Sequence, residues 1–124
     1  MIIDNAEVVI EMGKQRFHCA MDVTMHFIGG KWKTVVLWYL RNDKKRFSEL
    51  KALMPQITEK MLSIQLKQLE GDGLVKRTVY TSKPPLKVEY TLTDFGQSLI
   101  PLLNEIASWG RKTGNEKGKI VKAG

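Results

Sequence analysis

The stretch ITEKMLSIQLKQLEGDGLVKR, residues 57–77, has the pattern of an amphipathic helix that ends on glycine and continues directly into a strand. Three leucines, Leu62, Leu66 and Leu69, recur at intervals of three and four residues, which places them on one side of a helix. We therefore expect these leucines to bury one side of the helix in a core. The opposite side then faces solvent or a partner.

The residues before this helix predict a second, shorter helix joined to it by a tight turn. Ser48 is a candidate N-cap for the shorter helix, and Pro55 ends it because proline disfavours helical backbone in the residue before it. Thr58, a few residues downstream, is a candidate N-cap for the helix of residues 58–71. Two helices joined by so short a turn cannot lie flat and antiparallel, so the pair predicts a helix-turn-helix.

The residues after the helix predict a β-hairpin. The helix is expected to end at Gly71 or Gly73, because glycine adopts a positive φ at little cost. LVKRTVYT (74–81) and LKVEYTLT (86–93) then follow as two runs rich in Val, Tyr and Thr, separated by SKPP. The two prolines make the connecting loop stiff and extended. A hairpin in this position is the wing of a winged helix-turn-helix.

Further helices are expected on both sides of this unit. One should run from Asp22, as its N-cap, to Ile28, and another, which faces the core, should lie within residues 31–42. A last long helix should follow the N-cap Thr93, and Pro101 should kink this helix or split it in two.

The last helix carries an apolar stripe that is wider than a core of this size can cover. Its members, spaced at helical intervals, are Phe95, Leu99, Leu102, Leu103, Ile106 and Trp109. Part of the stripe is therefore expected to meet a second subunit.

Together these elements predict an α+β fold that is mainly helical: a winged helix-turn-helix with a two-stranded wing and flanking N- and C-terminal helices for dimerisation. A chain of 124 residues with 43% hydrophobic content suffices for one small core. We expect an N-terminal arm over residues 1–20, a DNA-binding and dimerisation domain over residues 21–112, and a disordered basic tail over residues 113–124.

The charge of the chain is uneven and favours a polyanionic partner. Twenty Lys and Arg against thirteen Asp and Glu give a net charge of +7. Residues 31–90 hold thirteen basic and six acidic side chains, whereas residues 1–30 sum to −2. Surfaces of this kind bind nucleic acid by releasing counterions, although many soluble proteins without such a partner are also basic.

The outward side of the 58–71 helix suits contact with a DNA duplex. At 100° per residue, the side chains opposite or flanking the three leucines are Lys60, Ser63, Ile64, Lys67 and Gln68. Lysine reaches phosphate or guanine, serine serves either, glutamine suits adenine, and isoleucine can meet the methyl group of thymine. The plain alternative is a solvated helix surface with one stray exposed isoleucine. Thr58 is expected to cap the helix and to donate to a phosphate.

Basic residues outside this helix are candidates for contact with the DNA backbone. Lys83 and Lys87 are expected at the tip of the wing, and Lys76 and Arg77 at its base. The two tip lysines can follow phosphates or enter the minor groove, or they merely discourage strand pairing at an exposed edge. Arg46 can hold the DNA backbone beside the shorter helix, or simply pair with the acid three residues on.

The chain lacks the signatures of a metal site or an enzyme. Cys19 is its single cysteine, which excludes an internal disulfide and a zinc site of several cysteines. His18 and His26 lie near it without the spacing of a zinc site. A glycine-rich phosphate loop, a GxSxG elbow and an HExxH motif are all missing from the sequence. We therefore expect neither catalysis nor a cofactor.

The sequence also favours a cytoplasmic protein that makes no membrane contact. No apolar run approaches the length that spans a bilayer. The stretch MIIDNAEVVIEMGK at the N-terminus carries acids where a signal peptide carries positive charge.

Six features of the sequence recur together in one known family. They are Cys19, IGGKWK (28–33), RFSELK (46–51), ITEKMLS (57–63), the leucine pair within QLKQLEGDGLVKR (65–77), and VEYTLTDFG (88–96). Their order resembles the HxlR family of bacterial winged-helix regulators, over residues 19 to about 110. The resemblance implies a homodimeric regulator that binds double-stranded DNA at inverted-repeat operators, with dimer contacts from the N- and C-terminal helices. Ile64 stands where the family usually has a polar or basic residue, so the family's base preference does not carry over.

The resemblance also implies a role for Cys19, because in several members of the family this cysteine senses oxidants or electrophiles. Lys14, Arg16 and His18 precede it, and nearby cations lower the pKa of a thiol and raise its thiolate fraction. Oxidation to a sulfenic acid, or to an intersubunit disulfide, could then shift the two DNA-reading helices. The alternative is a small apolar residue without a sensing role.

Two other functions fit the same fold. One is a protein-interaction module, since winged helices are reused for that purpose. The other is a regulator controlled by a small-molecule effector in a dimer cavity lined by Trp32, Trp38, Met25 and Trp109, although aromatic residues at helical spacing commonly form plain core. A steep loss of affinity with salt distinguishes a DNA-binding regulator from the module. A response to quinone that survives Cys19→Ser excludes thiol sensing.

Overall fold

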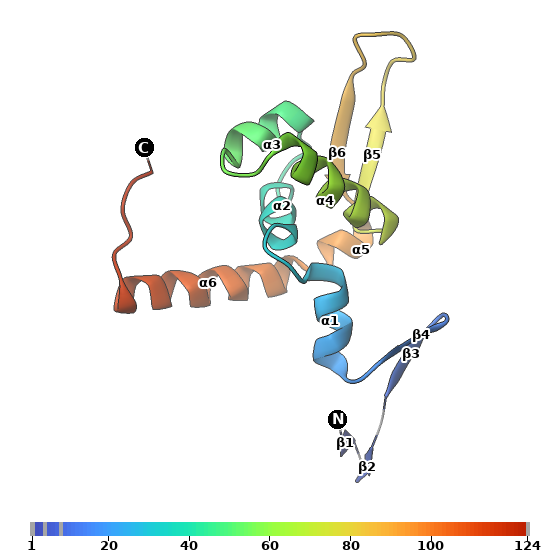
Figure 1. Cartoon of the computed structure of the whole chain (residues 1–124), viewed down its shortest axis with the longest axis vertical. Coiled ribbons are helices and arrows are strands. Elements are labelled where there is room, and N and C mark those ends of the chain that lie inside the picture. Colours follow the sequence, from blue (N-terminus) through green and yellow to red (C-terminus); the bar gives the residue numbers. More distant parts are fainter. Residues whose placement is uncertain (1, 4, 8, 124) are drawn as a thin grey trace.

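The structure is a computed structural model that describes residues 2, 3, 5–7 and 9–123. Three helices form the centre of the molecule (Figure 1). They are α2 (Lys33–Tyr39), α3 (Phe47–Leu53) and α4 (Glu59–Gly71). α4 turns its three leucines inward, and Leu62, Leu66 and Leu69 are 0%, 2% and 0% exposed. The predicted buried side of this helix is confirmed.

The core extends from these leucines into every neighbouring element. Leu37 of α2 and Leu50 of α3 are fully buried beside them, as are Leu74 and Val75 at the start of the wing. Because each of these elements contributes at least one fully buried apolar side chain, the helices and the wing share a single core.

α2 ends at Tyr39, three residues before the predicted boundary. The guanidinium of Arg41 donates to the carbonyl oxygen of Trp38 at 2.8 Å and lies over the Trp38 ring at 3.7 Å from its centroid. A cation that satisfies a carbonyl in the last turn stabilises the helix end at this point.

The predicted helix-turn-helix is confirmed, with one correction to its caps. The hydroxyl of Thr58 accepts a hydrogen bond from the amide of Met61 at 3.0 Å, so Thr58 caps α4 as expected. Ser48, however, lies inside α3 and is not its N-cap. The N-cap is Arg46, two residues earlier, and the carboxylate of Glu49 reaches back to accept from the amide of Arg46 at 2.8 Å.

The predicted wing is an antiparallel hairpin of β5 (Val75–Val79) and β6 (Val88–Leu92), in the register that pairs Val75 with Leu92. Gly73, at φ +78°, makes the turn between α4 and β5. The loop at the far end of the hairpin projects beyond the helices (Figure 1). α4 leads directly into the wing, and the two elements lie side by side (Figure 1).

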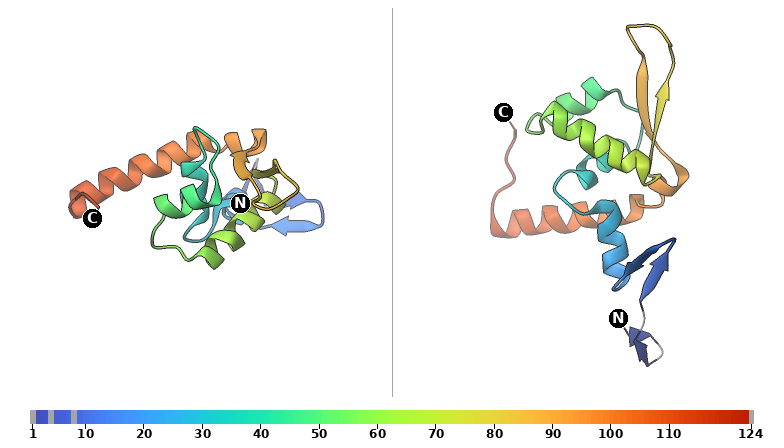
Figure 2. Two further views of the ribbon diagram at one scale, coloured as in Figure 1. Left: turned by 90° about the horizontal axis from the view of Figure 1, so that it is seen from above. Right: turned by 45° about the vertical axis from the view of Figure 1, so that its right-hand side comes forward.

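The predicted C-terminal helix is split in two, as Pro101 suggested. Thr93 caps the short α5 (Asp94–Gln97), because its hydroxyl accepts a hydrogen bond from the amide of Gly96 at 3.0 Å. α6 (Ile100–Lys117) then starts with Pro101 in its first turn, where a missing amide hydrogen costs nothing. α6 is a long rod that leaves the core sideways (Figure 2). It continues past the predicted tail boundary at residue 113, so residues 113–117 are helical rather than disordered.

The N-terminal segment forms two small hairpins and a helix that project away from the core (Figure 1). The hairpins are β1 (Ile2–Ile3) with β2 (Ala6–Glu7), and β3 (Ile10–Met12) with β4 (Gln15–Phe17). Residues 1, 4 and 8 of the predicted arm, and residue 124 of the predicted tail, lie outside the described residues.

α1 (Ala20–Ile28) starts two residues before its predicted cap. Its N-cap is Cys19, and Asp22 lies in the first turn, where its carboxylate accepts from the amide of His18 at 3.0 Å. The acid thus satisfies a backbone amide just before the helix, and an acid in a first turn also favours the helix dipole. Within the described part of the chain, no helix is both long and apolar enough to cross a bilayer.

Candidate nucleic-acid interface

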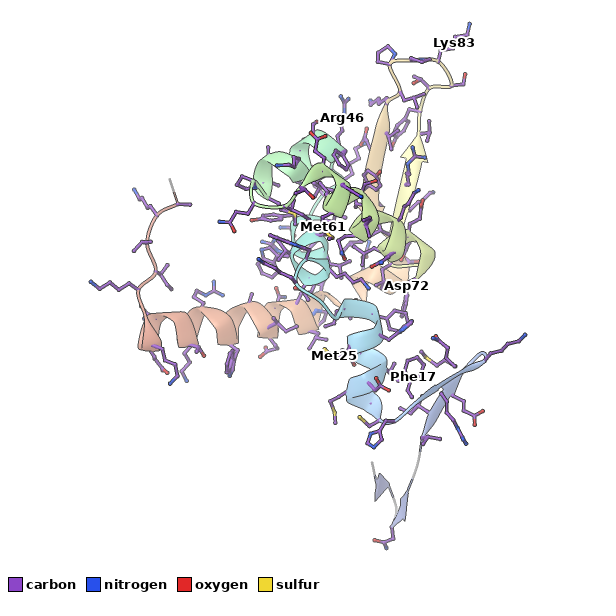
Figure 3. All side chains as sticks on the ribbon, in the orientation of Figure 1. Phe17, Met25, Arg46, Met61, Asp72 and Lys83 are labelled. Carbon is purple, nitrogen blue, oxygen red and sulfur yellow. The ribbon has the colours of Figure 1, made fainter. Side chains whose placement is uncertain are left out.

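The outer side of α4 presents the side chains that its sequence predicts. Those that lie exposed there are Lys60, Ser63, Ile64, Lys67 and Gln68. The exposed fraction of Ile64 is 38%, and Met61, in the same helix, is 37% exposed. Met61 was not among the predicted site residues, although helical spacing places it about as far from the three leucines as Ser63. Figure 3 shows Met61 on α4.

A polar crevice separates α4 from the wing. Its volume is about 390 Å³, and its lining consists of Ser63, Leu66, Lys67, Glu70, Arg77 and Tyr90. Ser63 and Lys67 are therefore on the flank of α4 that faces the wing, and Arg77 is on the face of the wing that looks back at α4. The sequence marked Arg77 only as a basic residue at the base of the wing.

The two wing lysines occupy different places. Lys83 lies at the tip of the loop between the strands, as predicted (Figure 3). Lys87 lies at the neck, where its amide donates to the hydroxyl of Thr81 at 3.1 Å and its carbonyl accepts from the amide of Tyr80 at 2.8 Å. Its ammonium is 3.7 Å from a carboxylate oxygen of Glu89 and 5.1 Å from the centre of the Tyr80 ring. The prediction that placed Lys87 at the tip is wrong, because the hydrogen bond from the Tyr80 amide holds Lys87 next to the paired strands.

Arg46 lies exposed directly before α3, beside the wing (Figure 3). A polar hollow of about 440 Å³ adjoins it, lined by Asp43, Lys44, Arg46, Ser48, Glu49 and Glu89. The carboxylate of Glu49 accepts a hydrogen bond from the backbone amide of Arg46. Contact between the Arg46 guanidinium and the DNA backbone stays a prediction.

Glu89 is a buried acid that the sequence pattern did not single out. Alternation along β6 predicts Glu89 on an open face opposite Val88 and Tyr90, yet the residue is 7% exposed. The loop before α3 covers that face and brings Lys44 to 3.3 Å from Glu89. Hydrogen bonding to Glu89, and then its negative charge, raise the pKa of Lys44 above its ordinary value.

Cys19 lies half-buried at the N-terminus of α1. A hydrogen bond with the His18 side chain is the main cause that lowers the pKa of its thiol, followed by the backbone amides of Asp22 and Met21, while partial burial opposes them. Of the three basic residues expected to act on the thiol, only His18 does so, because Arg16 pairs with Glu11 at 3.4 Å and Lys14 lies in the hairpin turn. The helix amides were not part of the prediction, since they follow from the true start of α1.

His26 lies between two aromatic rings rather than beside other metal ligands. Its ring meets the rings of Phe17 and Phe27 edge-on, with centroids at 5.3 Å and 5.0 Å. Among the described residues, no three His, Cys, Asp or Glu side chains gather in a way that could hold a metal ion.

Apolar side chains are exposed along α1 and α6. Met21 and Met25 on α1, and Leu102, Ile106 and Trp109 on α6, have exposed fractions between 37% and 71%. A hollow of about 190 Å³ between α2 and α6 is lined by Trp38, Tyr39, Leu103 and Ile106 among others.

The four residues of the effector cavity expected in a dimer differ in their exposure within one chain. Trp32 and Trp38 pack against the core, whereas Met25 and Trp109 are 54% and 71% exposed on α1 and α6.

The molecule combines a helix-turn-helix, whose second helix is anchored by leucines and basic on its outer side, with an adjoining hairpin wing. These features define the class of winged helix-turn-helix transcriptional regulators. Within that class the chain belongs to the HxlR-like helix-turn-helix family, whose sequence profile matches residues 27–118. The matched range does not include Cys19.

Relatives and solved structures agree with this assignment. The uncharacterized HTH-type transcriptional regulator YtcD of Bacillus subtilis is 50% identical over 99 residues, which cover 80% of this chain and 78% of YtcD. The redox regulator HypR in its reduced form is similar in structure, with a TM-score of 0.73 and 42% identity over 77% of this chain and 93% of HypR. Quinone-bound YodB of B. subtilis has a TM-score of 0.62 and 30% identity over 74% of this chain and 96% of YodB.

Proposed function

We propose that this protein is a homodimeric, sequence-specific regulator that binds double-stranded DNA with the outer side of α4 in the major groove. The observation that carries the proposal is the two-sidedness of α4: three leucines, at most 2% exposed, fix one side to the core, while lysines and Ile64 stand free on the other. A helix anchored in this way presents the same side chains to every duplex it meets, which sequence readout requires.

Each part of the surface has its own role in this proposal. Lys60 and Lys67 contact phosphates or guanine, Ser63 and Gln68 contact base edges or phosphates, and Ile64 meets thymine methyl groups. Outside α4, Thr58, Arg46 and Lys83 contact the DNA backbone.

The exposed apolar side chains of α1 and α6 support a dimer. Trp109 and Met25 are large apolar residues that a single chain leaves more than half exposed, and clusters of this kind mark protein interfaces. Two copies related by a two-fold axis would present two α4 helices, and their DNA site would then be an inverted repeat.

Cys19 supports regulation by oxidants or electrophiles. Its thiol is partly accessible and its pKa is lowered, which increases the reactive thiolate. A quinone would accept the sulfur on a ring carbon and take up the proton, which leaves a hydroquinone thioether. A peroxide would instead transfer one oxygen atom, giving a sulfenic acid and water, and a second Cys19 thiol would condense with that acid to a disulfide and a second water. The names of the similar structures, a redox regulator and a quinone-bound protein, fit this chemistry.

Selection of duplexes from random DNA, followed by a salt titration, tests the proposal. The selected sequences should share an inverted repeat, and the logarithm of the affinity should fall steeply with the logarithm of the salt concentration. Quinone should release the DNA from the wild-type protein and leave the complex of Cys19→Ser intact. Failure to bind any duplex at low ionic strength would contradict DNA binding, and a quinone response that survives in Cys19→Ser would contradict thiol sensing.

A further inference from the structure

β6 is attached along both of its edges. β5 pairs with one edge, and Lys45 forms a single bridge with Tyr90 on the other. The amide of Lys45 donates to the Tyr90 carbonyl oxygen at 3.0 Å, and the amide of Tyr90 donates to the Lys45 carbonyl oxygen at 2.8 Å. Since α3 begins at Phe47, this bridge connects the wing to the first helix of the helix-turn-helix.

Glu89 adds a second attachment beside this bridge. Its side chain is 9% exposed, with one carboxylate oxygen 3.3 Å from the ammonium of Lys44 and the other 3.7 Å from that of Lys87. Lys44 belongs to the loop before α3, and Lys87 ends the loop of the wing. One carboxylate therefore joins the wing loop, β6 and the start of the helix-turn-helix.

Because Glu89 is buried, its carboxylate depends on the contacts with the two lysines. A carboxylate removed from water is stable only while cations or hydrogen-bond donors replace its hydration. If the wing swung away from the loop before α3, Glu89 would lose Lys44. Its charge also repels phosphate, so a direct contact with DNA does not explain its position within a basic wing.

We propose that Glu89 is a positioning residue of the DNA interface: through Lys44 and Lys87 it fixes the wing against the α3–α4 unit, and so fixes the place where Lys83 meets the DNA backbone. This inference rests on the proposed DNA-binding function. It assigns Lys87 to the support of the wing and leaves Lys83 as the lysine at its tip that contacts phosphate.

A double-mutant cycle on DNA binding tests the inference. Glu89→Gln keeps the size of the side chain and removes its charge. Glu116→Gln makes the same change of net charge at an exposed position near the end of α6 and serves as the matched control. Each variant is combined with Lys83→Ala, and the dissociation constants are measured for the duplex that the wild-type protein selects from random DNA.

We expect Lys83 to lose its contribution to DNA affinity only in the Glu89→Gln background. Lys83→Ala should weaken binding by about threefold in the wild-type protein and in Glu116→Gln, as for one lost phosphate contact, and by less than about 1.5-fold in Glu89→Gln. An equal factor in all three backgrounds, or no effect of Lys83→Ala in the wild-type protein, would overturn the role of Glu89. A wild-type protein that binds no duplex would instead overturn the proposed function itself.

Hydrogen exchange without DNA separates a local attachment from general stability. In Glu89→Gln the amides of Lys45 and Tyr90 should exchange about tenfold faster, because the bridge opens locally, while the amide of Leu62 in α4 changes far less. Glu89→Asp, which keeps the charge on a shorter side chain, should recover part of the protection. A uniform change at all three amides would mean that Glu89 contributes only to global stability, which contradicts the inference.

Discussion

The exposed side of α4 combines positive charge with apolar surface over two helical turns. Ile64 and Met61 are 38% and 37% exposed between Lys60 and Lys67. One exposed apolar residue is ordinary on a protein surface, but two among lysines on the same helix suit the edge of a base pair, where the thymine methyl group lies beside phosphates. In the proposed complex, the lysines of this helix hold the DNA backbone and the isoleucine distinguishes bases.

Lys67→Ala tests the first of these roles. The variant should bind every duplex more weakly by a similar factor, and the slope of log affinity against log salt should fall by about one, because one phosphate contact releases fewer counterions. Lys112→Ala, which removes the same charge from an exposed position on α6, is the control and should leave the slope nearly unchanged. A loss confined to particular base sequences would contradict a phosphate role for Lys67.

The reactivity of Cys19 should depend on pH as expected for a lowered thiol pKa. Because only the thiolate reacts, the alkylation rate should rise with pH to a midpoint below that of an unperturbed cysteine. His18→Ala removes the principal cause of the lowering and should move the midpoint upward. A midpoint at or above that of free cysteine in the wild-type protein would contradict the activation of this thiol.

At the scale of elements, local signals predicted the helices and the hairpin well but missed effects that come from packing. The leucines of α4, the cap Thr58 and Pro101 act through neighbours in sequence, so their consequences are visible in the sequence. Glu89 is buried by the loop before α3, which is distant in sequence, and the strand pattern therefore gave no sign of it. The start of α1 was misplaced for a related reason: Asp22 has the character of a cap but binds the amide of His18 from within the first turn.

Gly96 shows how closely α5 packs on the wing, and its replacement is a test of that packing. A methyl group at Gly96 would overlap the backbone carbonyl of Leu74, which cannot move without shifting the start of β5. Gly96→Ala should lower the free energy of unfolding by about 1–3 kcal/mol in chemical denaturation.

The matched control for Gly96→Ala is Gly110→Ala. Gly110 lies in α6 with open space around it, so this change should raise the free energy of unfolding by about 0.5–1 kcal/mol through helix propensity alone. Equal effects of the two substitutions would contradict the close contact between α5 and the wing.

At the scale of the whole molecule, a compact winged unit carries two extensions whose apolar surfaces it does not cover. α1 leaves the core on one side and α6 on another, and Trp109 on α6 is 71% exposed (Figure 1). For α6, the sequence predicted this surplus from the width of the apolar stripe. The geometry of a dimer lies beyond the sequence, because it depends on how the extensions of two chains meet.

Trp109→Glu tests the dimer. A charged side chain in an apolar interface loses hydration without a partner, so the variant should sediment as a monomer at concentrations where the wild-type protein is a dimer. Its affinity for a full inverted repeat should fall toward that for a single half-site. A variant that remains dimeric would exclude the end of α6 from the interface.

The central claim is that the outer side of α4 reads bases. Its most direct test compares the affinities of Ile64→Ala and of the wild-type protein for all single-base variants of the selected duplex. We expect the preference to change at one base position in each half-site, by about 1–3 kcal/mol, with the other positions and the salt slope preserved. An unchanged preference at every position, or a uniform loss across all duplexes, would contradict the claim.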